Sequence, residues 1–305
     1  MMDTPLGRQA APRPLYILLH LYKTAGQTLA TNIQLNLSGP LALQMYVGPM
    51  GLDISKAIGS PANPGWVTER VNTYAAEYVG AHTRLVYGHM AYYGLHQVVT
   101  TPVEPRYMVF VRNPIERVIS LYYYLRYKSD NYWHHEMVEA GWDVEAWLEH
   151  SRALWHHNGQ VRQLLIGKDD SVSHLRDLNA EHLAAAKRHL EAFWFIGTTE
   201  TFTADALYMY GLFNFRKFHS EEQVNVTPRK DAVSKRLREL IGQQNALDLA
   251  LYEYAQRRRA ELIAARRGDY VLQRTRAGLR QQLYRWKQAR AARLEQSKIT
   301  SSQQG

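Results

Sequence analysis

The 305-residue sequence contains no cysteine, which excludes disulfide frameworks, thiolate metal sites and cysteine nucleophiles together. It also lacks any apolar run long enough to cross a membrane. The apolar stretch Leu15–Tyr22 follows two arginines, but it is short, contains His20 and leads into Lys23, so it does not match a secretory signal peptide. We therefore expect a cytoplasmic protein and leave contact with the periphery of a membrane open.

The main part of the chain has almost no net charge, although the whole carries +9 and has a pI near 9.6. From Gln256 to the end there are 13 Lys/Arg and 3 Asp/Glu, a net of +10. The preceding 255 residues hold 24 basic and 25 acidic residues, a net of −1. The basicity therefore belongs to the C-terminal segment. No nucleic-acid recognition module accompanies it, so we expect no nucleic-acid partner.

Short apolar stretches separated by segments of helical spacing predict the fold. Four stretches suit buried strands: Leu15–His20, Arg84–His89, Arg106–Val111 and Phe193–Thr198. Their alternation with helices predicts an α/β fold, a P-loop-like parallel sheet flanked by helices on both faces. Residues 40–65, rich in Gly and Pro, are expected to form a loop. We expect residues 1–14 to be disordered, 15–255 to form the α/β domain and 256–305 to form a basic helical extension.

A Walker A phosphate loop is also absent, because it needs glycines directly before its lysine and five residues earlier, where this chain has Tyr22 and Ile17. The stretch HLYKTAGQTL nevertheless places Lys23 between a strand and a helix. Backbone N–H groups and the positive helix end favour a phosphate or sulfate at such a turn. An ordinary capped helix with a solvated lysine explains this segment equally well when it is taken alone.

The stretch VFVRNPIERVIS supplies a second cationic position. Arg112 leaves the third strand at its carboxyl end, the edge where ligands bind in parallel sheets, and Ser120 lies nearly two turns into the next helix. A guanidinium suits bidentate contact with phosphate. The alternative is a surface Arg–Glu pair, for which Glu116 and Arg117 are better placed.

Together the two stretches resemble the nucleotide-binding segments of sulfotransferases. HLYKTAGQTL is similar to their 5′-phosphosulfate loop, close to H-x-P-K-T-A-G/S-[ST]-[ST], and VRNPIERVISLYYYLR to their 3′-phosphate segment, R-[DN]-P-x-E-R-x-x-S-x-Y-Y. The combination is more specific than either half, and the resemblance spans most of residues 15–255. The nearest group is the membrane-anchored carbohydrate type, including the uronyl 2-O-sulfotransferases.

The resemblance implies 3′-phosphoadenosine-5′-phosphosulfate (PAPS) as sulfuryl donor, adenosine 3′,5′-bisphosphate (PAP) as product, and no metal. A 5′-phosphosulfate site would consist of Lys23, Thr24, Ala25, Gly26, Gln27 and Thr28. Arg112 and Ser120 would hold the 3′-phosphate, and Lys23 would also stabilise charge on the leaving group. The stretch around Thr227, Arg229 and Lys230 is similar, by a looser alignment, to a region that closes over the nucleotide.

His89 is the candidate general base. The stretch VYGHM resembles the H-G-H-[VM] segment of the family, whose histidine at this point deprotonates the acceptor hydroxyl. A neutral imidazole suits that task. A structural histidine at a strand end is the alternative, and His82 and His96 are the next candidates for the base.

The chain departs from the family pattern at three positions. Tyr22 replaces a proline, Gln27 replaces a hydroxyl residue, and Tyr87 replaces the first histidine of the uronyl enzymes. These departures affect the predicted acceptor more than the predicted donor. For the acceptor we expect a hydroxyl of a bacterial carbohydrate or glycolipid. Two alternatives stay open: an ATP-dependent P-loop phosphotransferase and a non-catalytic binding module.

The C-terminal segment from Arg257 to Gln304 is expected to be a basic helix with leucines and Trp286 on roughly one side, interrupted at Gly268 and Gly278. Docking or self-association through this helix is one interpretation. Contact with an anionic membrane surface or a polyanionic glycan is the other.

Overall fold

The computed structural model describes residues 12–46, 50, 65–129, 132–151, 154–167, 170–173, 175, 177–219 and 233–302. Its centre is a parallel sheet of five strands in the order β2-β3-β1-β4-β5. The strands are β1 (Arg13–Leu19), β2 (Ala42–Gln44), β3 (Leu85–Gly88), β4 (Val103–Val111) and β5 (Phe195–Thr198). The predicted α/β fold with a parallel sheet is therefore confirmed.

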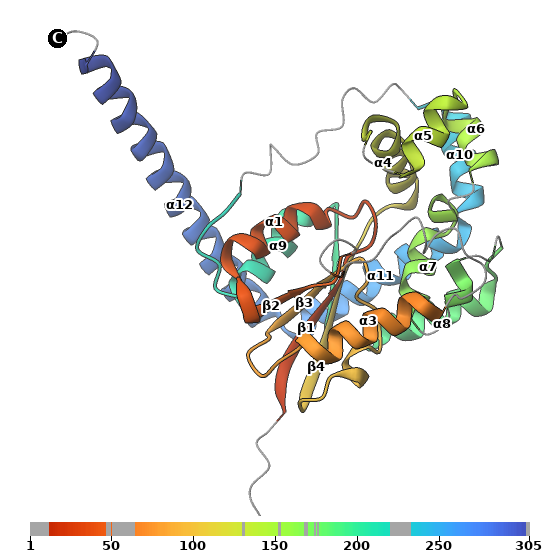
Figure 1. Cartoon of the computed structure of the whole chain (residues 1–305), viewed down its shortest axis with the longest axis horizontal. Helices are drawn as coiled ribbons and strands as arrows, with labels where there is room; N and C mark the ends of the chain where they lie inside the picture. Colours follow the sequence, from red (N-terminus) through yellow and green to blue (C-terminus); the bar gives the residue numbers. More distant parts are fainter. Residues whose placement is uncertain are drawn as a thin grey trace, which may run out of the picture.

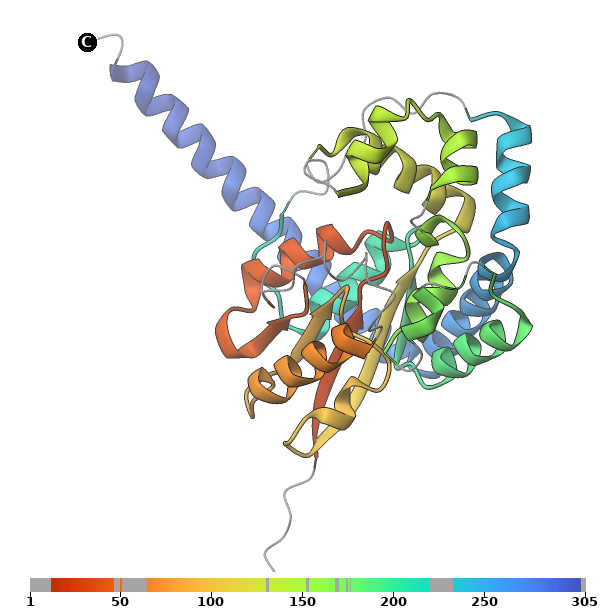
Figure 2. The same cartoon turned by 45° about the vertical axis from the view of Figure 1, so that its right-hand side comes forward.

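Helices cover both faces of this sheet (Figures 1 and 2). One face packs against α1 (Gly26–Asn36), α9 (Phe202–Leu212) and the start of α12 (Arg267–Ser302). The other packs against α3 (Gly65–Tyr78), α7 (Gly159–Leu165), α8 (Ala180–Glu191) and α11 (Ala246–Ala265). Short 3-10 turns complete the connections: η1 (Gly39–Leu41), η2 (Leu95–Val98), η3 (Leu154–His156) and η4 (Asp170–Ser173).

The central strand β1 shows why the sheet needs cover on both sides. Leu15, Ile17 and Leu19 are almost fully buried in one cluster, whereas the intervening Leu18 is buried in the other. Successive side chains of a strand point to opposite faces, so an unbroken apolar run requires two apolar layers. Each such side chain contributes about 1.5–3 kcal/mol by leaving water.

A separate helical lobe stands beyond the carboxyl ends of the strands (Figure 2). It contains α4 (Pro114–Tyr127), α5 (Tyr132–Glu139), α6 (Val144–His150) and α10 (Lys235–Gln244), which enclose their own apolar cluster around Tyr122 and Trp147. Helix α4 begins as the sequence indicates: the Asn113 side chain accepts hydrogen bonds from two backbone N–H groups, and Pro114 occupies the first turn.

Two sequence expectations are corrected by the structure. Residues 40–65 are not wholly loop, because β2 pairs with β3 in parallel. A three-residue strand is too short to show a period, and its backbone partners on β3 define it. The basic helix expected from Arg257 to Gln304 is divided at Arg266 into α11 and α12, whereas Gly268 and Gly278 both lie within α12. Within the described residues, no helix combines the length and apolarity that a membrane crossing requires.

Candidate active site

The carboxyl ends of three adjacent strands bring the sequence-predicted residues together. His20 follows β1, His89 follows β3 and Arg112 follows β4. The ladder between β1 and β3 continues to this edge, where Leu19 is opposite Gly88 and the His20 N–H donates to the Gly88 carbonyl at 3.1 Å. Loops that leave parallel strands at one edge can surround a single ligand.

The turn between β1 and α1 has the backbone of an anion cradle. Lys23 and Ala25 both have positive φ, 65° and 64°, which is uncommon for residues with a Cβ. The Thr24 hydroxyl donates to the Leu21 carbonyl at 2.8 Å, so it fixes the turn instead of donating to a ligand. Unlike α4, helix α1 has no side-chain cap at its start. Its first N–H groups therefore suit an anion.

Gly26 is required by the close approach of His20. A Cβ at position 26 would overlap the His20 imidazole ring. The glycine thus lets the first turn of α1 lie directly against the ring that ends β1. The Arg112 guanidinium donates to the Lys23 carbonyl at 3.1 Å, and the Lys23 ammonium lies 4.1 Å from the centre of the Tyr124 ring. Both candidate phosphate-binding cations are therefore at the same turn.

His89 is held in a stack of aromatic rings beside this turn. Its ring centroid lies 4.0 Å from that of His20 and 4.2 Å from that of Tyr22, with interplanar angles of 25° and 22°. Its Nδ1 lies 2.6 Å from the His20 carbonyl oxygen. Because a carbonyl can only accept, Nδ1 carries the proton in the neutral ring and Nε2 holds the free electron pair.

The position of His89 depends on the glycine that precedes it. Gly88 has φ of 147°, and a Cβ there would overlap the Met45 carbonyl at the end of β2. Tyr46, the next residue along, accepts or donates a 2.8 Å hydrogen bond with His20 Nδ1 and meets the His89 ring edge-on. The two residues that follow β2, Met45 and Tyr46, therefore complete the wall behind both histidines.

Burial keeps both histidines neutral. It lowers the pKa of His89 to about 4, an effect that the nearby Lys23 charge reinforces and the hydrogen bond to His20 opposes. Burial, followed by the charges of His89 and Lys23, lowers the pKa of His20 well below its ordinary value. Two neutral imidazoles beside two cations form a site that is ready for an anion.

A model of the sulfotransferase family matches residues 96–255, slightly more than half of the chain. The chain belongs to the sulfotransferase family. The matched residues include Arg112 and Ser120 and begin after Lys23 and His89. A comparison with curated protein sequences finds no match. Sulfotransfer in general is thereby supported, and members of this family generally use PAPS as the sulfuryl donor.

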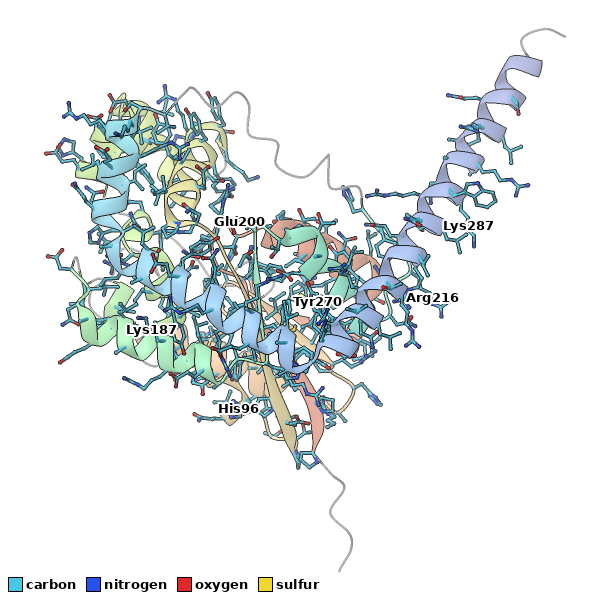
Figure 3. The ribbon with its side chains drawn as sticks, turned by 180° about the vertical axis from the view of Figure 1, so that it is seen from behind. His96, Lys187, Glu200, Arg216, Tyr270 and Lys287 are labelled. Atoms are coloured by element: carbon cyan, nitrogen blue, oxygen red, sulfur yellow. The ribbon has the colours of Figure 1, made fainter. Side chains whose placement is uncertain are left out.

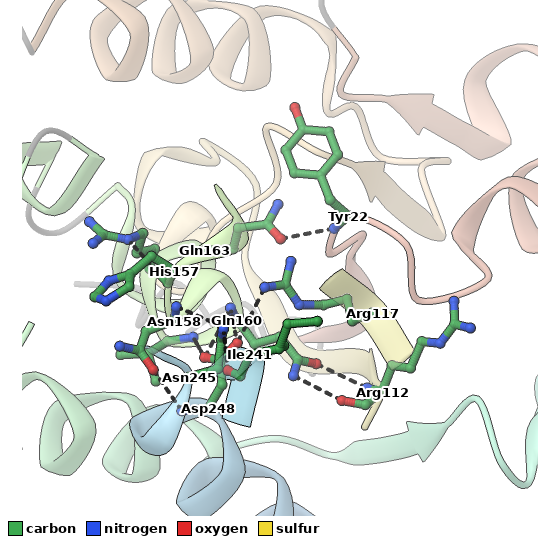
Figure 4. Close-up of polar contacts among 12 residues, drawn as sticks. Tyr22, Arg112, Arg117, His157, Asn158, Gln160, Gln163, Ile241, Asn245 and Asp248 are labelled. Atoms are coloured by element: carbon green, nitrogen blue, oxygen red, sulfur yellow. Dashed lines mark hydrogen bonds and ion pairs between the residues drawn. The ribbon is translucent and has the colours of Figure 1, made fainter. Parts of the chain in front are cut away.

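The candidate site rests on a polar scaffold from α7 and α11 that the sequence patterns did not indicate (Figure 4). The Gln160 side chain accepts from the Arg112 N–H and donates to the Arg112 carbonyl, both at 2.9 Å. The Gln163 side chain accepts from the Tyr22 N–H at 2.8 Å. Two glutamines three residues apart on α7 are the signal that could have indicated this role.

Beneath these glutamines, Asp248 on α11 anchors the start of α7. Its carboxylate accepts from the Gln160 and Val161 N–H groups at 2.8–3.1 Å and forms a 3.5 Å ion pair with Arg117. Both charged side chains are fully buried. Within the described part of the chain, the guanidinium nitrogens of Arg117 form no hydrogen bond, so Asp248 is the charge that compensates them. Arg117 is therefore not a surface partner of Glu116, which pairs with Arg238 instead.

The remaining candidates differ in position. Ser120 is buried on α4, Gln27 is exposed, and Thr28 is partly buried in the first turn of α1. His82 is exposed before β3, and His96 lies 2.8 Å from the Tyr107 hydroxyl, toward the opposite end of the sheet from Glu200 (Figure 3). Neither is at the edge that carries Lys23. Thr227, Arg229 and Lys230 lie outside the described residues.

Proposed function

We propose that this sulfotransferase moves the sulfuryl group of PAPS to a hydroxyl of a carbohydrate or glycoconjugate, with His89 as general base. The observation that carries the proposal is the fixed tautomer of His89 beside the Lys23 turn. Its Nδ1 is committed to the His20 carbonyl, and Nε2 is left with the electron pair that a base needs. A ring clamped by two aromatic neighbours also keeps its orientation.

The donor fits the residues at this edge by charge and by backbone geometry. Lys23 and the uncapped start of α1 suit the 5′-phosphosulfate, and Arg112 suits the 3′-phosphate. When bound, the donor supplies the sulfuryl group that the acceptor oxygen takes as the bond to the 5′-phosphate breaks. His89 would receive the acceptor's proton, and Lys23 would stabilise the charge that develops on the phosphate oxygen.

The acceptor is assigned only by class. Aromatic side chains near His89 include Tyr22 and Trp155, whose ring centroids lie 5.5 Å apart. Such rings offer an apolar body with a polar tip, which suits the face and hydroxyls of a sugar. Tyr22 stands where the family pattern has a proline, so it is a feature of this chain from which a distinct acceptor preference would follow.

The test measures donor binding and turnover separately. PAP should raise the melting temperature without Mg²⁺, and ATP with Mg²⁺ should raise it far less. Labelled sulfate from PAPS should then appear in a member of a panel of polysaccharides and glycolipids, and His89→Ala should lower its rate of appearance by roughly 10²–10⁴-fold. Binding of PAP without transfer to any acceptor would favour the non-catalytic module. Equal stabilisation by ATP with Mg²⁺ would overturn the donor assignment.

A further inference from the structure

The second half of α12 extends away from the rest of the molecule (Figures 1 and 3). Its first half packs on α9: Tyr270 and Ala277 are buried, and the Tyr208 hydroxyl donates to Asp269 at 2.9 Å. The last ring contact with the body is that of Tyr284 with Phe218. Residues 285–297 are all exposed. Residues 285–297 contribute nothing to the core, so their side chains need another explanation.

The exposed part of α12 carries large apolar side chains on one side. Besides Val271, which lies about 100° from Leu272 around the helix, five have exposed fractions between 46% and 62%: Leu272, Leu279, Leu283, Trp286 and Leu294. Their spacings of 7, 4, 3 and 8 residues keep them on one helical face. Ala277 and Leu279 are two residues apart, or roughly 200° around the helix, so this apolar stripe lies opposite the face that packs on α9.

The same helix is strongly basic. Residues 271–297 contain seven Lys/Arg and one Glu, a net of +6. Arg290 lies over the Trp286 ring at 5.5 Å, and Lys287 projects from the same exposed turn (Figure 3). A helix with leucines and tryptophan on one face, bordered by cations, has the chemistry of a surface that meets anionic lipid headgroups.

Charge decides between a lipid surface and a second copy of the chain. The spacing that joins Leu279, Leu283 and Trp286 continues to Arg290 and Arg293. A second α12 on this stripe would bury those guanidiniums and bring two helices of net +6 together. At a membrane, their aliphatic stems can lie on the apolar layer while the charged ends reach phosphate.

We propose that α12 binds an anionic phospholipid membrane, lying in its surface with the Leu272–Leu294 stripe inserted among the acyl chains. Lipid phosphates then neutralise the arginines and lysines that border the stripe. The proposal does not depend on the catalytic assignment, because no residue of the candidate site lies on α12.

The experiment is sedimentation of the full chain with two kinds of vesicle: phosphatidylcholine alone, and phosphatidylcholine with about a third phosphatidylglycerol. We expect the protein to sediment with the second kind only, and less so as salt is raised. The variant Leu279→Ser/Leu283→Ser/Trp286→Ser should bind at least about tenfold more weakly, because the inserted area is lost. The control Gln288→Ser/Ala291→Ser/Ala292→Ser changes three exposed residues away from the stripe and should bind like the wild type.

Three results would overturn the proposal. One is the absence of binding to either vesicle. A second is that the stripe variant binds the anionic vesicles as well as the wild type does and that a soluble polyanionic glycan displaces the protein from them. The helix would then bind polyanions through its charge alone, without inserting the apolar stripe. The third is a dimer in sedimentation velocity without lipid that the stripe substitutions dissociate, because a second copy would then cover the stripe. All variants should melt like the wild type, since the changed side chains are exposed.

Discussion

At the scale of single residues, the protonation of His89 is the property on which catalysis would depend. With a pKa lowered to about 4 by burial, the ring is a free base throughout the neutral range. We expect kcat/KM for the donor to rise with pH through about 4 and to be flat near 6.5, the ordinary histidine value. The rise of kcat with pH should occur at a higher pH than the rise of kcat/KM, because the phosphates of the bound donor favour the imidazolium form of His89. The pH–rate profiles of both parameters measure this.

His89→Ala should remove that limb and lower turnover by roughly 10²–10⁴-fold, while PAP binding is largely kept. His82→Ala is the matched control, because His82 is exposed away from the site edge and its loss should leave the profile unchanged. A wild-type limb near 6.5, or a His89→Ala variant with near-normal turnover, would contradict the assignment of the base.

The two cations at the turn should differ in what their removal costs. Arg112→Ala should weaken PAP binding by about 2–3 kcal/mol, because a charged hydrogen-bond donor and its tie to the Lys23 carbonyl are both lost. Lys23→Ala should lower kcat more than PAP affinity, since its charge acts on the leaving group. Calorimetric titration and steady-state kinetics measure the two effects. Arg238→Ala, which breaks only the surface pair with Glu116, should change neither, and normal PAP affinity in Arg112→Ala would remove the 3′-phosphate assignment.

At the scale of elements, α7 and α11 hold the site through the buried pair of Asp248 and Arg117. Asp248→Asn leaves a buried guanidinium without its counter-charge, so we expect a loss of about 3–5 kcal/mol in the free energy of unfolding. The double substitution Arg117→Met/Asp248→Asn should recover much of that loss, because neither charge then remains buried and the amide oxygen can still accept from the Gln160 and Val161 N–H groups. Urea unfolding measures both values. Glu116→Gln at the exposed pair is the control, and equal, additive losses in the double variant would contradict the pairing.

The same elements show what the sequence could predict. Strands β1, β3, β4 and β5 each contain a short apolar run, and α4 begins with a capping Asn and a Pro, so local chemistry indicates them. Strand β2 has no local signal, because its pairing with β3 defines it. In the candidate site, the Lys23 turn and His89 lie in recognisable stretches. Gln160, Gln163 and Asp248 do not, because their roles depend on contacts between α7, α11 and strands distant in the chain.

At the scale of the whole molecule, the two histidines of the site couple folding to pH. The pKa values of His20 and His89 are lowered in the folded state, so the unfolded chain binds more protons below about 6.5. The free energy of unfolding should therefore be highest above that pH and decrease as the pH falls from about 6.5 toward 4. Thermal melts across this range measure the slope. His20→Asn/His89→Asn, in which neither position titrates, should flatten this slope, whereas His82→Asn should not.

PAP should oppose the loss of stability at acidic pH, because its phosphates favour the protonated forms of His20 and His89, which burial disfavours in the absence of ligand. A slope unchanged in the double variant would assign the acid sensitivity to other groups.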